Sequence, residues 1–66
     1  MSEFARHAAS LYADDAISYA RRGQCGLARH HLNDARESLR ADGPAPRVRA
    51  HVREAASAVR SCRGRS

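Results

Sequence analysis

The strongest constraint on this chain is its shortage of large apolar side chains. Only nine of the 66 residues are Leu, Ile, Val or Phe, whereas 14 are Ala. Below about 70 residues a chain usually depends on a crosslink, a metal or a partner for its stability, because it has too little surface to bury. We therefore expect one small domain, marginal as an isolated monomer, that acts as a homo-oligomer or as an obligate subunit of a complex.

Helical spacing of the apolar residues predicts three helices, near residues 3–22, 27–41 and 47–61. Gly23 ends the first helix, and large and small side chains occupy neighbouring strips of it. The large side chains are Phe4, Leu11, Tyr12 and Tyr19, together with Ala8; the small ones are Ala9, Ala13, Ala16 and Ala20. Small residues let helices approach closely. The predicted fold class is therefore all-α: a helical hairpin with a third amphipathic helix folded across it.

A Gly-Pro-Ala-Pro segment at residues 43–46 predicts a hinge, because proline fixes its own backbone and restricts the residue before it. Within the single domain, this hinge separates residues 1–42 from residues 47–66. In the second part apolar residues recur at spacings of four and three, which is typical of a packing seam. The seam consists of Val48, Val52, Ala55 and Val59. Two heptads do not make a free-standing coiled coil, so the seam either closes the chain's own core or pairs two copies.

Charge is distributed unevenly along the sequence. All 12 basic residues are Arg, against seven acidic residues. Residues 1–42 are neutral, whereas residues 43–66 contain six Arg and only Glu54, followed by a tail that we expect to fray. The helical wheel of the third helix aligns Arg49, Arg53 and Arg60, with Arg63 close by. Because guanidinium binds carboxylate and phosphate alike, this stripe predicts an acidic partner, either a protein surface or a nucleic acid.

The first two predicted helices resemble a single tetratricopeptide repeat, in which large, small and aromatic positions recur over about 34 residues. The residues that carry the resemblance are Tyr12, Ala16, Tyr19, Gly23, Ala28, Leu32 and Ala35. Two positions depart from the pattern: Asp15 stands where it has Leu, and Arg40 where it has the closing Pro, which arrives late at Pro44. The resemblance implies a protein-binding adaptor without catalytic activity.

A single repeat of this kind cannot bury its own apolar face. If the third helix covers one side of the hairpin, the side that bears Tyr12 and Tyr19 stays open to a partner. Asp15 falls in the middle of that side, where a carboxylate is costly unless it is paired. It is a partly exposed carboxylate at the rim of the core, or one paired with Arg22 or a tyrosine hydroxyl, or an anchor for a basic residue of the partner.

Metal and catalytic sites are not predicted. The side chains that could bind zinc are Cys25, Cys62, His7, His30, His31 and His51, but they lack the usual ligand spacings. We expect the two cysteines to be free thiols in a reducing, cytoplasmic environment, with a Cys25–Cys62 disulfide as the alternative. No apolar run reaches the length of a membrane span, and the first residues lack the order of a signal peptide.

These observations predict a non-enzymatic protein-binding module without a cofactor that docks on a larger protein and regulates it. The predicted binding residues are Tyr12, Asp15, Tyr19, Arg49, Arg53, Arg60 and Arg63. One alternative is an accessory protein that binds nucleic acid through the arginine stripe. A second alternative is a self-assembling subunit whose valine seam pairs between copies.

Overall fold

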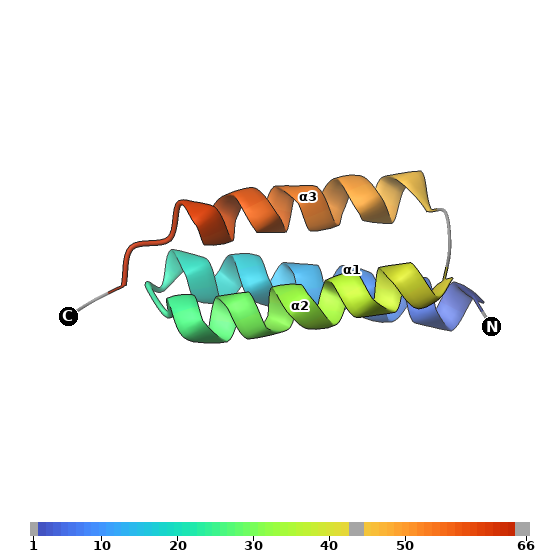
Figure 1. Cartoon of the computed structure of the whole chain (residues 1–66), viewed down its shortest axis with the longest axis horizontal. Helices are drawn as coiled ribbons and strands as arrows, with labels where there is room; N and C mark the ends of the chain where they lie inside the picture. The colour runs from blue at the N-terminus through green and yellow to red at the C-terminus, as the bar shows by residue number, and fades with distance from the viewer. Residues whose placement is uncertain (1, 43–44, 65–66) are drawn as a thin grey trace.

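The computed structural model describes the backbone of residues 2–42 and 45–64 and the side chains of residues 8–41 and 45–64. Within these ranges it contains three helices and no strand: α1 (Ser2–Arg21), α2 (Cys25–Asp42) and α3 (Pro46–Arg60). They form an elongated bundle, 41 Å long and 15 × 13 Å across, in which α3 lies along the α1–α2 hairpin (Figure 1). The predicted all-α fold of three packed helices is confirmed.

A tight turn joins α1 to α2. Gly23 has φ 78°, the left-handed conformation that glycine adopts without steric cost. Its N–H donates to the Ala20 carbonyl (3.0 Å), and the Gln24 N–H donates to the Tyr19 carbonyl (2.9 Å), which together make a Schellman motif. The Gln24 carbonyl then accepts from Ala28. As a result α2 begins at Cys25, two residues earlier than predicted, because the motif completes the reversal within three residues.

The buried core consists mainly of alanine. The most buried side chains are Ala9, Ala13, Ala16, Ala28, Leu32, Ala35, Ala45, Val52, Ala55 and Ala56. No large side chain of the described residues is completely buried. The helices approach one another along the small side chains, so the strip of small residues on α1 forms its core face. The large-residue face is displaced to the edge, and Leu11 is 49% exposed. Phe4, which was expected on that face, lies outside the described side chains.

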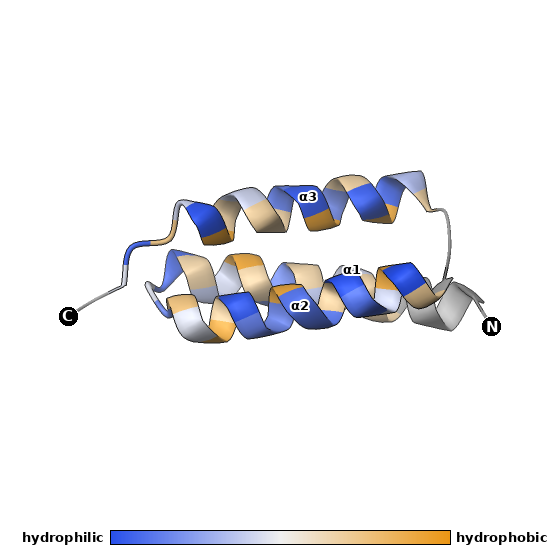
Figure 2. Ribbon diagram, viewed as in Figure 1, coloured by the Kyte–Doolittle hydropathy of each residue, from blue (hydrophilic) through white to orange (hydrophobic). Residues whose placement is uncertain are grey.

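The predicted seam on α3 faces the chain's own hairpin. Val52 and Ala55 lie within the core, and Val48 and Val59 pack against it. The orange stripes in Figure 2 mark such apolar positions on α3 and on the two helices below it. The structure therefore uses this seam to close the single chain. Pro46, placed in the predicted hinge, is the first residue of α3; Gly43 and Pro44 lie outside the described residues.

A disulfide joins Cys25, at the start of α2, to Cys62, just after α3, with a Cα–Cα distance of 5.8 Å. The expectation of free thiols is therefore wrong, and the alternative pairing is the one found. Sequence reasoning gave the disulfide little weight because it could not see that the turn after α1 and the end of α3 meet. Disulfides are typical of oxidising compartments, which weighs against a cytoplasmic location. Among the described residues, no helix has the length and apolar character needed to cross a bilayer.

The disulfide closes a loop with a sequence separation of 37 residues. A crosslink over that separation lowers the entropy of the unfolded chain, which corresponds to roughly 4 kcal/mol of stability. We predict that the double variant Cys25→Ser/Cys62→Ser loses about this much free energy of unfolding, measured by urea denaturation monitored by circular dichroism. Reduction of the native protein should produce the same loss. An unchanged urea midpoint after reduction would contradict the prediction.

The alanine core makes a second prediction about stability. Ala16 has no exposed surface, so Ala16→Leu would push the helices apart and lower the free energy of unfolding by about 1–3 kcal/mol. Ala50, on α3, is exposed. The matched variant Ala50→Leu should change stability by no more than about 0.5 kcal/mol. Stabilisation by leucine at position 16, measured in the same urea experiment, would show that the core is underpacked.

Candidate functional site

The arginine stripe predicted on α3 is exposed along most of its length. Arg49, Arg53 and Arg60 are exposed residues of the helix. Arg63 is also exposed, but it follows the end of α3 at Arg60 and does not belong to the helical stripe. The predicted proximity of Arg63 depended on a helix that reached residue 61. The helix supplies only the first three residues of the predicted set.

Neighbouring contacts show which side of α3 the stripe occupies. His51 contacts Asp14 of α1, so this flank of α3 faces α1. Ala56 lies on the opposite flank and is 8% exposed. Arg49 and Arg60 are placed seven residues before and four residues after Ala56, which puts them on the same side of the helix. The stripe therefore borders the groove between α3 and α2.

Helix α2 contributes three more arginines to this groove. Cys25 and Leu32 mark the side of α2 that faces α3, since Cys25 is bonded to Cys62 and Leu32 lies in the shared core. Arg29 and Arg36 each follow one of these residues by four positions, and Arg40 follows Arg36 by four. Residues four apart lie on the same face of a helix. All three arginines are exposed.

These six residues form what we call the arginine face: Arg29, Arg36, Arg40, Arg49, Arg53 and Arg60. Hydrophilic positions occur on α2 and α3 on the side turned to the viewer in Figure 2. Sequence reasoning missed the α2 half because residues 1–42 are neutral in sum. Two described acids of that segment lie on other sides: Asp14 contacts His51 on the α1–α3 flank, and Glu37 is exposed on the outer side of α2.

The arginines of the two helices lie level with one another. Helix α2 ends at Asp42 and α3 begins at Pro46, while Cys25 and Cys62 meet at the other end. In an antiparallel pair of helices, residues at the same level have numbers with a constant sum. This sum is 87 for Cys25 and Cys62, and 88 for Asp42 and Pro46. The arginine pairs Arg29/Arg60, Arg36/Arg53 and Arg40/Arg49 each add to 89, so the members of each pair lie within about 3 Å of the same level along the helix axes.

The arginine face carries six positive charges. Among the side chains that the structure describes, no carboxylate lies within ion-pair distance of any of the six guanidinium groups; the pairs found there all involve histidine. The two rows of arginines run side by side along α2 and α3, and the axes of packed helices are roughly 8–10 Å apart. This arrangement is suited to binding anions, because a guanidinium presents a planar fork of donors that matches carboxylate and phosphate oxygens.

A second surface lies in the groove between α1 and α2. The Tyr19 ring stacks on His31, with centroids 5.1 Å apart and an interplanar angle of 10°, and the Tyr12 ring lies 6.4 Å from His31. Arg22 covers Tyr19, with its guanidinium carbon 5.7 Å from the ring centroid. We call Tyr12, Tyr19 and His31 the tyrosine–histidine patch. Its rings are half-buried.

The tyrosine–histidine patch has an unsatisfied polar atom and an exposed apolar neighbour. The His31 Nδ1 atom is buried and has no hydrogen-bond partner among the described residues. Leu27, one helical turn before His31, is 46% exposed. Asp15, the third residue of the predicted tyrosine face, is exposed, because the core lies on the small-residue strip of α1. It therefore carries no burial penalty, which agrees with the interpretation of an exposed carboxylate at the rim of the core.

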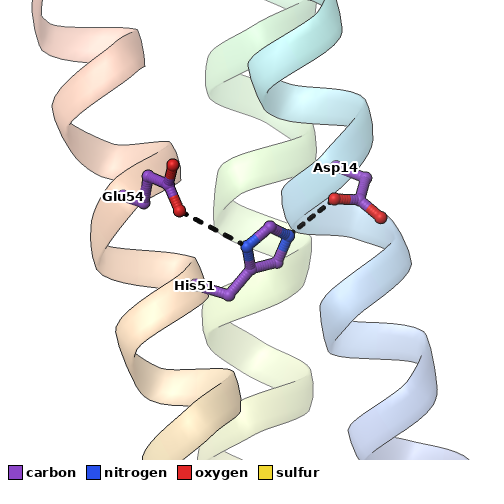
Figure 3. A network of polar contacts seen from close by, with 3 residues as sticks. All are labelled: Asp14, His51 and Glu54. Atoms are coloured by element: carbon purple, nitrogen blue, oxygen red, sulfur yellow. Dashed lines mark hydrogen bonds and ion pairs between the residues drawn. The ribbon is translucent and has the colours of Figure 1, made fainter.

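A polar network connects α1 to α3. The His51 ring points between two carboxylates (Figure 3): its Nε2 atom lies 2.6 Å from Asp14 Oδ1, and its Nδ1 atom lies 3.7 Å from Glu54 Oε1. The network borders an open cleft of about 400 Å³. The cleft is lined by Asp14, Ile17, Ser18, Arg21, Arg22, His51 and Glu54. With mixed charges and wide exposure, the network serves mainly to dock α3 on α1.

The His51–Asp14 contact should contribute modestly to stability, because Asp14 is 60% exposed and exposed pairs are screened by water. We predict a coupling free energy of about 0.5–1 kcal/mol in a double-mutant cycle with His51→Ala and Asp14→Ala, measured by urea unfolding. The matched cycle at His30 and Asp34, which lie 3.8 Å apart on one helix, should give less. A coupling free energy above about 2 kcal/mol between His51 and Asp14 would show that the contact is shielded from water.

The residues considered for zinc binding are not assembled into a site. Cys25 and Cys62 are bonded to each other and cannot act as thiolate ligands. His30 and His31 lie edge to face, 5.8 Å apart, while His51 faces α1. No group of three potential ligands is found among the described residues. The side chain of His7 lies outside that part of the chain.

No protein-family model matches the sequence, and no curated protein or solved structure matches it significantly. The resemblance to a tetratricopeptide repeat therefore has no support from a family match.

Proposed function

We propose that the protein is a small, non-enzymatic binding module that docks on an acidic surface of a larger protein and regulates it as an inhibitor, chaperone or adaptor. The observation that carries the proposal is the arginine face. Two helices bring six exposed guanidinium groups to one groove, and no described carboxylate neutralises them. Carboxylates of a partner would reduce the repulsion between the rows and form charge-assisted hydrogen bonds.

The tyrosine–histidine patch supplies the apolar part of the proposed interface. Aromatic side chains are enriched in protein interfaces because they bury a large area while keeping a polar group available. Leu27 and the unpartnered His31 nitrogen add an apolar and a polar contact point. Both surfaces include side chains of α2, so a partner that wraps around α2 would contact both. This supports an obligate subunit of a complex.

The two alternative functions draw different support. Nucleic acid binding remains the second candidate, because phosphates suit the arginine face as well as carboxylates do. Self-assembly through the valine seam is disfavoured, since Val52 and Ala55 lie in the chain's own core. The tetratricopeptide resemblance agrees with an adaptor role, and its positions Ala16, Leu32 and Ala35 lie in the hydrophobic core.

The proposal is tested by capture of the partner with charge-reversal variants. The native protein and the variant Arg36→Glu/Arg53→Glu are each immobilised on a resin and incubated with extract of the source cells, with and without nuclease. The control is Arg21→Glu/Arg47→Glu, which changes the net charge equally at exposed arginines outside the face. We expect the native protein to capture a discrete protein whether or not nuclease is present. The control should capture the same amount of it, and the Arg36→Glu/Arg53→Glu variant at least tenfold less.

Two results would contradict protein docking through the arginine face. If nuclease removes all captured material, the ligand is nucleic acid, and its affinity should fall with salt at a logarithmic slope near −0.9 per neutralised phosphate. If both charge-reversal variants lose the captured protein equally, net charge and not the arginine face is responsible for binding.

A further inference from the structure

The spacing of the arginine face is more specific than its charge. Along α2 the arginines are separated by seven and then four residues, and along α3 by four and then seven. Because the helices run in opposite directions, the two series coincide at three levels. At 1.5 Å per residue the levels are about 10.5 Å and about 6 Å apart. Each level has one guanidinium on either side of the groove.

We propose that the groove between α2 and α3 binds an α-helix of a partner protein that carries acidic residues at positions i, i+4 and i+11. For the opposite direction of the bound helix the positions are i, i+7 and i+11. The proposal rests on the function proposed above and specifies the partner's chemistry. On a helix these positions fall within about 40° of one another, so the three carboxylates form one straight stripe.

Packed antiparallel helices can hold such a helix in the groove between them. Two adjacent antiparallel helices leave a position for a further helix between their outer sides, as in a four-helix bundle, and helices recognise such grooves through residues three, four and seven apart. A carboxylate over the middle of the groove lies between Arg36 and Arg53 and can accept hydrogen bonds from both. The aliphatic stems of the arginines provide apolar contact along the sides.

The composition of the arginine face favours a helix over nucleic acid. Single-stranded nucleic acid is usually held by aromatic side chains that stack on its bases. The described tyrosines, Tyr12 and Tyr19, lie in the other groove, between α1 and α2. In a duplex each strand winds around the axis, whereas the three arginine levels lie along one straight line. A stripe of carboxylates on a helix reproduces that line.

Designed helical peptides of about 22 residues test the pattern. One peptide carries three Glu at i, i+4 and i+11, a second carries them at i, i+7 and i+11, and a third has the same composition with Glu at i, i+5 and i+10, which scatters them around the helix. Binding is measured by fluorescence anisotropy at an ionic strength of about 0.02 M. We expect at least one striped peptide to bind roughly tenfold more tightly than the scattered peptide.

The protein variants locate the binding. Arg36→Gln/Arg53→Gln removes the middle level and should abolish the tenfold preference. Arg21→Gln/Arg47→Gln removes the same charge elsewhere and should preserve it. Circular dichroism of each variant verifies that the helices are intact, so that a loss of preference reports the removal of the level.

Three outcomes would overturn the helix proposal. Equal affinity for striped and scattered peptides would remove it while leaving docking on an acidic protein in place. If no peptide binds but a duplex of about 20 base pairs does, with the steep salt dependence given above, both this proposal and the protein-docking function are wrong. If neither binds, the helix proposal is wrong, and the capture experiment decides the proposed function separately.

Discussion

Close approach of the three helices along alanine is the interaction on which the rest of this structure depends. Leu32 and Val52 are the large members of a core whose other buried side chains are alanines. Small side chains bring backbones together and gain dispersion contacts over the length of the helices. They also leave no room for large residues at the crossings. The tyrosines and the arginine face are therefore displaced to the flanks, along the α1–α2 and α2–α3 grooves of the bundle.

The two ends of the α2–α3 pair fix the alignment of these flanking residues. One end is closed by the short connection between Asp42 and Pro46, and the other by the Cys25–Cys62 disulfide. With both ends held, α3 cannot slide along α2 without straining one of the two connections. The same constraint that holds a thin core together also keeps the arginines of the two helices at common levels. Stability and the proposed recognition surface thus have a shared origin.

Much of the fold could be predicted from the sequence because it depends on local signals. Helical periodicity, Gly23 and the Pro46 helix start locate the three helices to within two residues. The inward orientation of the valine seam was one of two alternatives that periodicity alone could not separate. The strip of small residues on α1 predicts close approach of the other helices, and Ala9, Ala13 and Ala16 of that strip are buried in the core.

The candidate site was less predictable because it depends on contacts between distant segments. The α3 stripe is visible in the sequence, but its α2 half is hidden by the neutral sum of residues 1–42. Arg36 and Arg53 become neighbours only through the antiparallel packing of α2 and α3. The disulfide could have provided a signal. Once Cys25 is paired with Cys62, the register of α2 against α3 is fixed, and residue numbers alone place the arginines of the two helices at common levels. Sequence reasoning favours free thiols, because two cysteines are too few for a disulfide-built scaffold and the position of Cys25 relative to Cys62 is not visible in the sequence.

The most direct test is an NMR titration of the arginine Nε–Hε resonances with tripolyphosphate, a small polyvalent anion that requires no folded partner. If α2 and α3 form one anion-binding face, the resonances of Arg29, Arg36, Arg40, Arg49, Arg53 and Arg60 should shift together, at lower concentrations than those of Arg21 and Arg47. Equal shifts at all of these arginines would mean that the positive charge is not gathered into a common site.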